Sequence, residues 1–146
     1  MLTYINEHQL QYWVLGNGSN LLISDQGLAG VVLLLSELKE LEFVGTKLKA
    51  GAGVKLPKLI TEAAEEGLTG LESLAGLPAS LGGAIASNAG ANGVWISDLL
   101  LEVKVLNSAG EIKTYDIADL DFKYRNSSLL KNEEIIIEAF LELKQS

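Results

Sequence analysis

Short apolar runs, separated by glycine-rich or polar turns, dominate the first third of the chain. Residues 12–15 are apolar and lead into a run of glycine, asparagine and serine, which predicts a buried strand followed by a loop. Residues 31–35 form a continuous apolar run of strand length, which predicts a strand buried on both faces. Residues 41–44 and 47–50 lie on either side of a Gly-Thr pair, so they predict a hairpin.

One amphipathic helix is predicted next, over residues 56–64. Apolar residues recur there at helical spacing, and glutamates occupy the opposite face. Pro57 stands where a first-turn proline belongs, and Gly67 follows the last periodic residue, where glycine commonly ends a helix.

Strand patterns return in the last third of the chain. Residues 102–106 and 111–115 alternate apolar and polar side chains on either side of a Ser-Ala-Gly turn, which predicts a second hairpin. Residues 135–143 predict a final strand. Strands and helices are therefore mixed along the chain, and the predicted fold class is α+β, built from α/β lobes.

Composition limits the chemistry that these elements can carry. The chain has 146 residues, no cysteine and one histidine, which excludes disulfides, thiolate nucleophiles and multi-histidine metal sites. Its net charge of −8 argues against nucleic acid or an anionic membrane as a partner. No leader pattern opens the sequence and no apolar run approaches membrane-spanning length, so we expect a cytoplasmic protein. The lack of cysteine and the single histidine lead us to expect no bound metal.

The first loop is a candidate anion site. It consists of Gly16, Asn17, Gly18, Ser19, Asn20 and Leu21. Two glycines after a strand allow backbone N–H groups to approach a ligand, which suits a pyrophosphate. Leu21 stands where a dinucleotide fingerprint would have its third glycine, and no Gly-Lys-Ser/Thr follows. A plain turn between two strands remains the alternative at this point.

Residues 70–93 are rich in glycine, alanine, serine and asparagine, and large side chains are nearly absent from 76–93. Such a run indicates that something large lies against the backbone, either a neighbouring helix or a flat ligand. Both interpretations remain open from composition alone.

Arg125 is the only arginine, and Tyr124 precedes it. A fixed guanidinium can clamp a carboxylate or stabilise a developing oxyanion. The alternative is a surface arginine paired with Asp119 or Asp121.

Other titratable groups suggest no catalytic set. His8 lies near the N-terminus, and no Ser-His-Asp arrangement is evident. Glu133 and Glu134 are interpreted as a charged approach to the last strand.

Three segments together resemble one family. Residues 15–22 (LGNGSNLL), residues 70–93 (GLESLAGLPASLGGAIASNAGANG) and residues 122–127 (FKYRNS) are similar, in order and spacing, to motifs of the UDP-N-acetylenolpyruvoylglucosamine reductases (UDP-N-acetylmuramate dehydrogenases). These flavoproteins act in peptidoglycan precursor synthesis. The resemblance implies an FAD-binding domain of the vanillyl-alcohol-oxidase type, with residues 1–36 as part of a first lobe and residues 37–146 as the second.

The resemblance also assigns roles. Residues 16–21 would take the FAD pyrophosphate, and Arg125, with Tyr124 beside it, would polarise the substrate carboxylate as hydride arrives. NADPH would donate hydride to FAD, and reduced FAD would pass it to the enolpyruvyl double bond of a UDP-sugar. The residues implied to lie along the cofactor are Gly76, Leu77, Pro78, Ser80, Gly82, Gly83, Ala86, Asn88, Ala89 and Gly90.

The chain departs from the family pattern in four respects. The family has more of the first lobe before the Gly16 loop than this sequence contains. Ala79 stands where the family usually has glycine, and Asn92 stands where an aromatic residue often precedes the last glycine. The family's C-terminal substrate domain, which supplies a proton-donating serine and a glutamate, has no counterpart in this sequence. We therefore expect the isolated chain to be catalytically incomplete. A flavin-binding fragment or paralogue without turnover is one alternative, and an interaction domain whose glycines serve packing is another.

Overall fold

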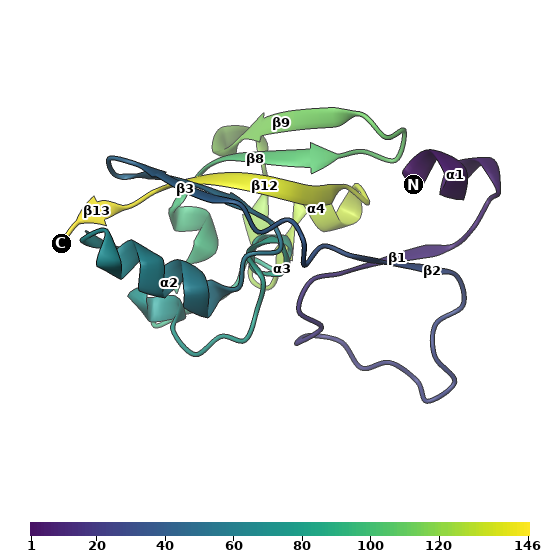
Figure 1. Cartoon of the computed structure of the whole chain (residues 1–146), viewed down its shortest axis with the longest axis horizontal. Coiled ribbons are helices and arrows are strands. Elements are labelled where there is room, and N and C mark those ends of the chain that lie inside the picture. The colour runs from purple at the N-terminus through teal and green to yellow at the C-terminus, as the bar shows by residue number, and fades with distance from the viewer.

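A five-stranded antiparallel sheet forms the centre of the computed structural model, which describes all 146 residues (Figure 1). In spatial order its strands are β3 (Leu41–Val44), β4 (Lys47–Gly51), β12 (Ile135–Glu142), β8 (Leu100–Leu106) and β9 (Ile112–Asp116). Both predicted hairpins and the predicted last strand are confirmed. Strand β12 lies in the middle of the sheet, between strands from the first and second hairpins.

Two helices lie on one side of this sheet: α2 (Leu56–Glu65) and α3 (Leu81–Ala86) (Figure 1). The predicted α2 is confirmed, with Pro57 in its first turn and Gly67 at a φ of +71° beyond its end. Its buried face belongs to a continuous core of 22 buried residues that joins the helices to the sheet. We call the sheet and the elements packed on it the large lobe.

A second, much smaller unit precedes the sheet. It consists of α1 (Leu2–Glu7), β1 (Tyr12–Leu15) and β2 (Val31–Leu34), and we call it the small lobe. The two strands pair in parallel, with Tyr12 opposite Val31 and Leu15 opposite Leu34. A long part of the segment between them, residues 16–30, projects from the body of the molecule (Figure 1).

The prediction that residues 31–35 are buried on both faces is wrong. Val32 is 40 % exposed and Leu34 is 64 % exposed, while Val31 and Leu33 pack against the cluster of Leu2, Ile5 and Ile135. The run forms a strand as expected, but only one of its faces meets another layer. An apolar run predicts a strand and does not by itself show that both of its faces are covered.

Shorter elements connect and flank these parts. They are β5 (Leu68–Thr69), β6 (Gly90–Ala91), β7 (Val94–Trp95), β10 (Phe122–Lys123), β11 (Asn126–Ser127), β13 (Lys144–Gln145), α4 (Ser128–Lys131) and the 3₁₀ turns Glu72–Leu74, Ile96–Asp98 and Ile117–Asp119. The predicted α+β class is confirmed. No helix combines the length and apolar character needed to span a bilayer.

Candidate functional site

The glycine-rich loop after β1 docks directly on the segment that leads into α3. Asn17 Nδ2 donates a hydrogen bond of 2.7 Å to the carbonyl oxygen of Pro78, 61 residues away. Gly16 lies so close to Ser80 that an added Cβ would collide with the Ser80 hydroxyl. Two of the segments singled out in the sequence therefore touch, and a side chain at position 16 would displace the Ser80 hydroxyl.

Small side chains on α3 leave space beside this loop. Ser80 caps the helix, with its Oγ accepting from the Gly83 N–H at 3.3 Å. Gly83, Ala86 and Ser87 then line a cavity of about 210 Å³, and the opposite wall is formed by residues 16–21. The loop and the small residues of α3 thus enclose one space.

Not every glycine of this stretch faces that space. Gly82 packs against Ala52 on the other side of α3, where an added Cβ would come within 2.9 Å of the Ala52 Cβ. Gly90 lies under the Trp95 ring, which an added Cβ would overlap. Gly76 has a φ of +88° and open space around it. Close packing and an open cavity therefore both account for the small residues.

Arg125 and Tyr124 form the turn of the hairpin made by β10 and β11. The hairpin is held at the C-terminal end of α3 by two bonds: Asn88 Nδ2 donates to the Lys123 carbonyl at 3.2 Å, and Ser127 Oγ donates to the Ala86 carbonyl at 2.8 Å. Arg125 has a φ of +50°, a conformation that costs free energy in a non-glycine residue. These two hydrogen bonds hold the turn in its strained conformation.

The guanidinium of Arg125 reaches the glycine-rich loop. Its Nη2 donates to Asn20 Oδ1 at 3.1 Å, across 105 residues of sequence. The alternative of a surface ion pair with Asp119 or Asp121 is wrong, because Asp121 instead lies 3.7 Å from Lys123 Nζ. The partner of Arg125 is a neutral amide, so its positive charge remains available to an anionic ligand.

A second cavity, of about 150 Å³, lies beside Arg125. Leu77, Asn88, Gly90, Trp95 and Tyr124 line it, and the Trp95 and Tyr124 rings meet edge to face at 5.8 Å. Ser87 lines both this cavity and the one at the loop, so the two are neighbours.

Asn88 stands out in the second cavity because one of its polar atoms has no partner. The residue is buried, with a φ of +44°, and its Oδ1 accepts no hydrogen bond from the protein. Buried acceptors in folded proteins are paired in the great majority of cases. This oxygen is thus suited to a donor group carried by a ligand.

Asn92, which departs from the family pattern, has a local structural explanation. It forms the turn between β6 and β7 together with Gly93, at φ values of +55° and +81°. Asparagine followed by glycine is favoured where both central residues of a hairpin turn need positive φ. The turn accounts for asparagine at this position.

Glu134 is a residue that the sequence interpretation missed. The sequence interpretation makes it part of a charged approach to the last strand; Glu133 is exposed, but Glu134 is half-buried. The Tyr115 hydroxyl donates to Glu134 Oε1 at 2.6 Å, and this hydrogen bond, helped by burial and the Glu134 charge, raises the pKa of Tyr115. Glu134 Oε2 is buried without a partner. No local sequence pattern identifies this pair, because Tyr115 comes from a different strand.

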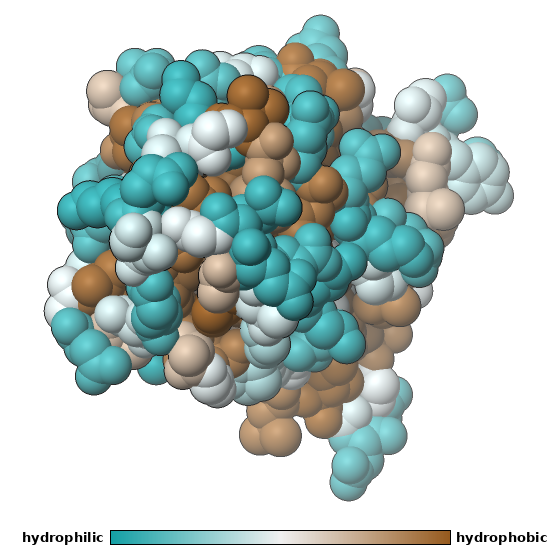
Figure 2. Space-filling model, turned by 60° about the vertical axis from the view of Figure 1, so that its left-hand side comes forward, coloured by the Kyte–Doolittle hydropathy of each residue, from teal (hydrophilic) through white to brown (hydrophobic).

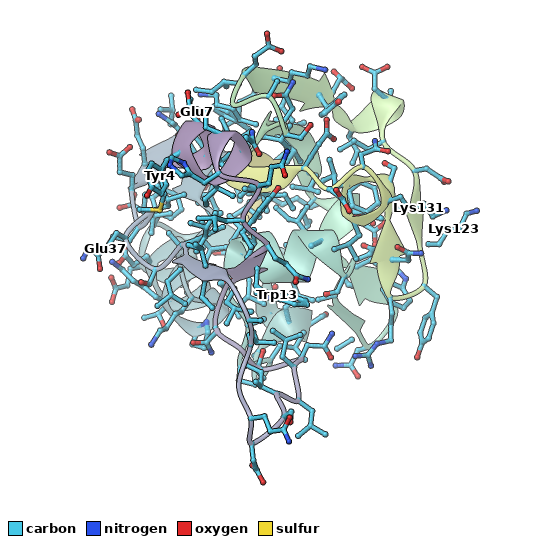
Figure 3. The ribbon with its side chains drawn as sticks, turned by 90° about the vertical axis from the view of Figure 1, so that its right-hand side faces the viewer. Tyr4, Glu7, Trp13, Glu37, Lys123 and Lys131 are labelled. Atoms are coloured by element: carbon cyan, nitrogen blue, oxygen red, sulfur yellow. The ribbon has the colours of Figure 1, made fainter.

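Further cavities extend from the loop toward Glu134. One, of about 130 Å³, is lined by Gly82, Gly83, Glu134 and others, and a larger one, of about 480 Å³, lies between β1 and α4. In Figure 3, Trp13 on β1 lies above the projecting loop and Lys131, at the end of α4, lies to its right. Most of the site residues inferred from sequence therefore line this row of neighbouring spaces, whereas Gly76 and Pro78 line none of them.

Comparison with known proteins identifies relatives over nearly the whole chain. A family model described as FAD binding domain matches residues 1–116. The UDP-N-acetylenolpyruvoylglucosamine reductase of Lactobacillus delbrueckii subsp. bulgaricus is 44 % identical over 144 residues, which is 99 % of this chain and 48 % of that protein. The protein of the same name from Lactiplantibacillus plantarum is 40 % identical, with the same coverage. The chain spans about half the length of these curated relatives.

Solved structures give a consistent result. The UDP-N-acetylenolpyruvylglucosamine reductase of Thermus caldophilus matches with a TM-score of 0.85 at 38 % identity, covering 99 % of this chain and 53 % of that one. The 6-hydroxy-D-nicotine oxidase of Arthrobacter nicotinovorans matches with a TM-score of 0.72 at 20 % identity, covering 99 % and 33 % respectively. The second likeness shows a shared fold only.

Proposed function

Because this chain belongs to the FAD binding domain family, we propose that it binds FAD between its two lobes, as the flavin-binding part of a UDP-N-acetylenolpyruvoylglucosamine reductase. The observation that carries this proposal is the cavity of about 210 Å³ that the glycine-rich loop, residues 16–21, encloses with Gly83, Ala86 and Ser87. Residues 1–36 would contribute the first-lobe side of the site and residues 37–146 the second-lobe side.

The pyrophosphate of FAD would be held by residues 16–21. No lysine or arginine lines the cavity at this loop, so its anion-binding groups are backbone amides. Gly18 has a φ of +69° and nothing within 4 Å of an added Cβ, which leaves its backbone open to a ligand. The flavin end would then lie along Gly83, Ala86 and Ser87 toward Asn88, whose free Oδ1 suits a ring N–H donor.

Bound FAD would supply the redox chemistry, the transfer of hydride from a nicotinamide to a substrate double bond. Arg125 would hold the carboxylate of an enolpyruvyl UDP-sugar and stabilise the charge that develops on it. Its neutral partner and its place on a strained, fixed turn favour that task, since the guanidinium is oriented but not neutralised. Tyr124, 77 % exposed, would line the approach of the substrate.

NADPH as hydride donor, and the cytoplasm as the place of reaction, belong to this proposal. The product would be UDP-N-acetylmuramate, which feeds peptidoglycan synthesis and so cell shape and division. The named reductases are about twice as long as this chain. We therefore assign FAD binding to these 146 residues and propose turnover only for a protein that also contains the remaining half.

The experiment is the visible absorption spectrum of the purified chain after incubation with FAD and desalting. Retained flavin bands are expected, and a colourless eluate would contradict the proposal. Gly18→Val serves as the site variant, because a β-branched residue at a φ of +69° distorts the loop. Gly45→Val is the matched control, with a φ of +62° and nothing near its Cβ, in a hairpin turn far from the site. Loss of flavin in the first variant alone is the expected result.

A further inference from the structure

We propose that Glu134 binds the adenosine half of FAD through its ribose hydroxyls, and that Tyr115 is the residue that positions it. This inference rests on the flavin function proposed above and adds to it a polarity for the bound dinucleotide. Neither residue belongs to any of the three segments that resemble the reductase family.

Glu134 immediately precedes β12 and is fixed by β9. The Tyr115 hydroxyl donates to Glu134 Oε1 at 2.6 Å. The same hydrogen bond is the main reason why the pKa of Tyr115 lies above its ordinary value, so the phenol keeps its proton and remains a donor. One carboxylate oxygen is therefore satisfied, and the orientation of the other is set.

The other oxygen, Oε2, is buried and receives no hydrogen bond from the protein. An unpaired buried acceptor is costly, more so when it belongs to a carboxylate. The cost is removed when a ligand brings a hydroxyl or amine donor to it. The pyrophosphate diester of a dinucleotide cannot do so, because it is fully ionised at neutral pH and offers only acceptors.

Glu134 faces the row of cavities and lies at one end of it. It lines a space of about 130 Å³ together with Gly16, Ser80 and Gly83, all of which also line the cavity at the glycine-rich loop. It also lines the cavity of about 480 Å³ beside β1. Val14 and Leu130 border all three spaces, so they form one groove.

The charges along this groove define a direction. Arg125 lies at one end, beside the second cavity, and Glu133 and Glu134 line the opposite end. The loop of residues 16–21, with its backbone amides, lies between them. FAD has its pyrophosphate in the middle, a flavin at one end and adenosine at the other. With the flavin at the Arg125 end, the adenosine ribose falls to the acidic end, and carboxylates are frequent partners of ribose hydroxyls in dinucleotide sites.

Calorimetric titration with FAD, FMN and ADP tests this direction, because FMN lacks the adenosine and ADP lacks the flavin. In Glu134→Gln we expect the affinity for FAD and for ADP to fall about tenfold, the effect of losing one hydrogen bond to a charged group. The affinity for FMN should stay within about twofold. Tyr115→Phe should show the same pattern with a smaller loss, since the carboxylate remains but is no longer oriented.

Glu65→Gln is the control, because it removes the same charge from an exposed side chain on α2 that lines none of these cavities. It should leave all three affinities unchanged, and thermal melting checks that each variant is folded. Equal losses for FMN and FAD in Glu134→Gln, or no loss for FAD and ADP, would overturn the Glu134 assignment and leave flavin binding intact. Glu134-dependent binding of ADP without binding of either flavin would overturn the flavin function instead. Failure of the wild-type protein to bind any of the three would overturn both.

Discussion

The large and small lobes differ in how completely they cover their apolar residues. The large lobe joins 22 buried residues in one core, whereas the cluster at the small lobe has three, one of which, Ile135, comes from β12. The small lobe leaves Trp13, Val14, Val32 and Leu34 at least 37 % exposed. Figure 2 shows apolar side chains also gathered at the lower end of the molecule, where residues 16–30 project in Figure 1.

The two lobes therefore make different contributions, the large lobe mainly to stability and the small lobe mainly to the binding groove. Burial of apolar area is the main source of folding free energy, so the large lobe supplies most of it. The small lobe supplies one wall of the groove and the loop that would approach a pyrophosphate. The wall of the groove that the small lobe forms is weakly packed, so it can adjust to a ligand. The opposite wall, formed by α3 and the β10–β11 hairpin, is held in place by the core of the large lobe.

The sharpest test of the contrast compares one leucine from each lobe. Leu141 on β12 is fully buried and Leu34 on β2 is 64 % exposed. Leu141→Ala should lower the free energy of unfolding by about 3 kcal/mol, because it removes packed methyl groups and leaves a cavity. Leu34→Ala should change it by less than about 0.5 kcal/mol. Urea unfolding followed by circular dichroism measures both, and similar losses would show that the small lobe is packed as tightly as the sheet.

Arg125 tests the functional side of the comparison. We expect Arg125→Ala, in a fusion of this chain to the remaining half of the Lactobacillus delbrueckii relative, to lower turnover about 100-fold, since a donor to the developing charge is lost. Flavin content should be unchanged. NADPH oxidation and the flavin absorbance measure the two properties, with Lys123→Ala as the neighbouring control. Loss of flavin from Arg125→Ala would show that the arginine binds the cofactor rather than the substrate.

The contact between the lobes is tested at Gly16. Gly16→Ala should weaken FAD binding about tenfold, because the new Cβ collides with the Ser80 hydroxyl and pushes the loop from α3. The double variant Gly16→Ala/Ser80→Ala removes the hydroxyl and should restore part of the affinity, whereas Ser80→Ala alone controls for the lost helix cap. Titration of flavin fluorescence gives the affinities. Equal weakening in the single Gly16→Ala and the double variant would exclude this clash as the cause.

The smallest effect concerns an ion pair that belongs to the large lobe only. Burial alone would raise the pKa of Glu138, but Lys104 at 2.7 Å and Lys49 at 3.3 Å outweigh it and hold the pKa below its ordinary value of 4.5. A lowered pKa stabilises the folded state above the pKa of the unfolded chain, and this stabilisation is lost as the pH falls through the lowered value. Glu138→Gln should therefore melt below the wild type at pH 7, and the two melting temperatures should converge toward pH 3.

Several parts of this molecule were predictable because their signals are local. Pro57 and Gly67 mark the ends of α2, and alternation marks the paired strands β8 and β9. The three motifs are continuous stretches of sequence, and they correspond to the glycine-rich loop, the α3 segment and the arginine hairpin. Each of these depends on residues close together in the chain, where backbone preference and side-chain periodicity act directly.

Other features depend on contacts between segments that are far apart in the sequence. The exposure of Val32 and Leu34 depends on which face of β2 another layer covers, and an apolar run carries no information about that. The Arg125–Asn20 bond spans 105 residues, and the Tyr115–Glu134 pair joins a strand to the segment before another. Some small residues of α3 pack on Ala52 and others line a cavity. Which residues do which depends on how α3 packs against the sheet. Local sequence thus specified the elements and the chemical groups available, whereas tertiary packing decided which of those groups face one another.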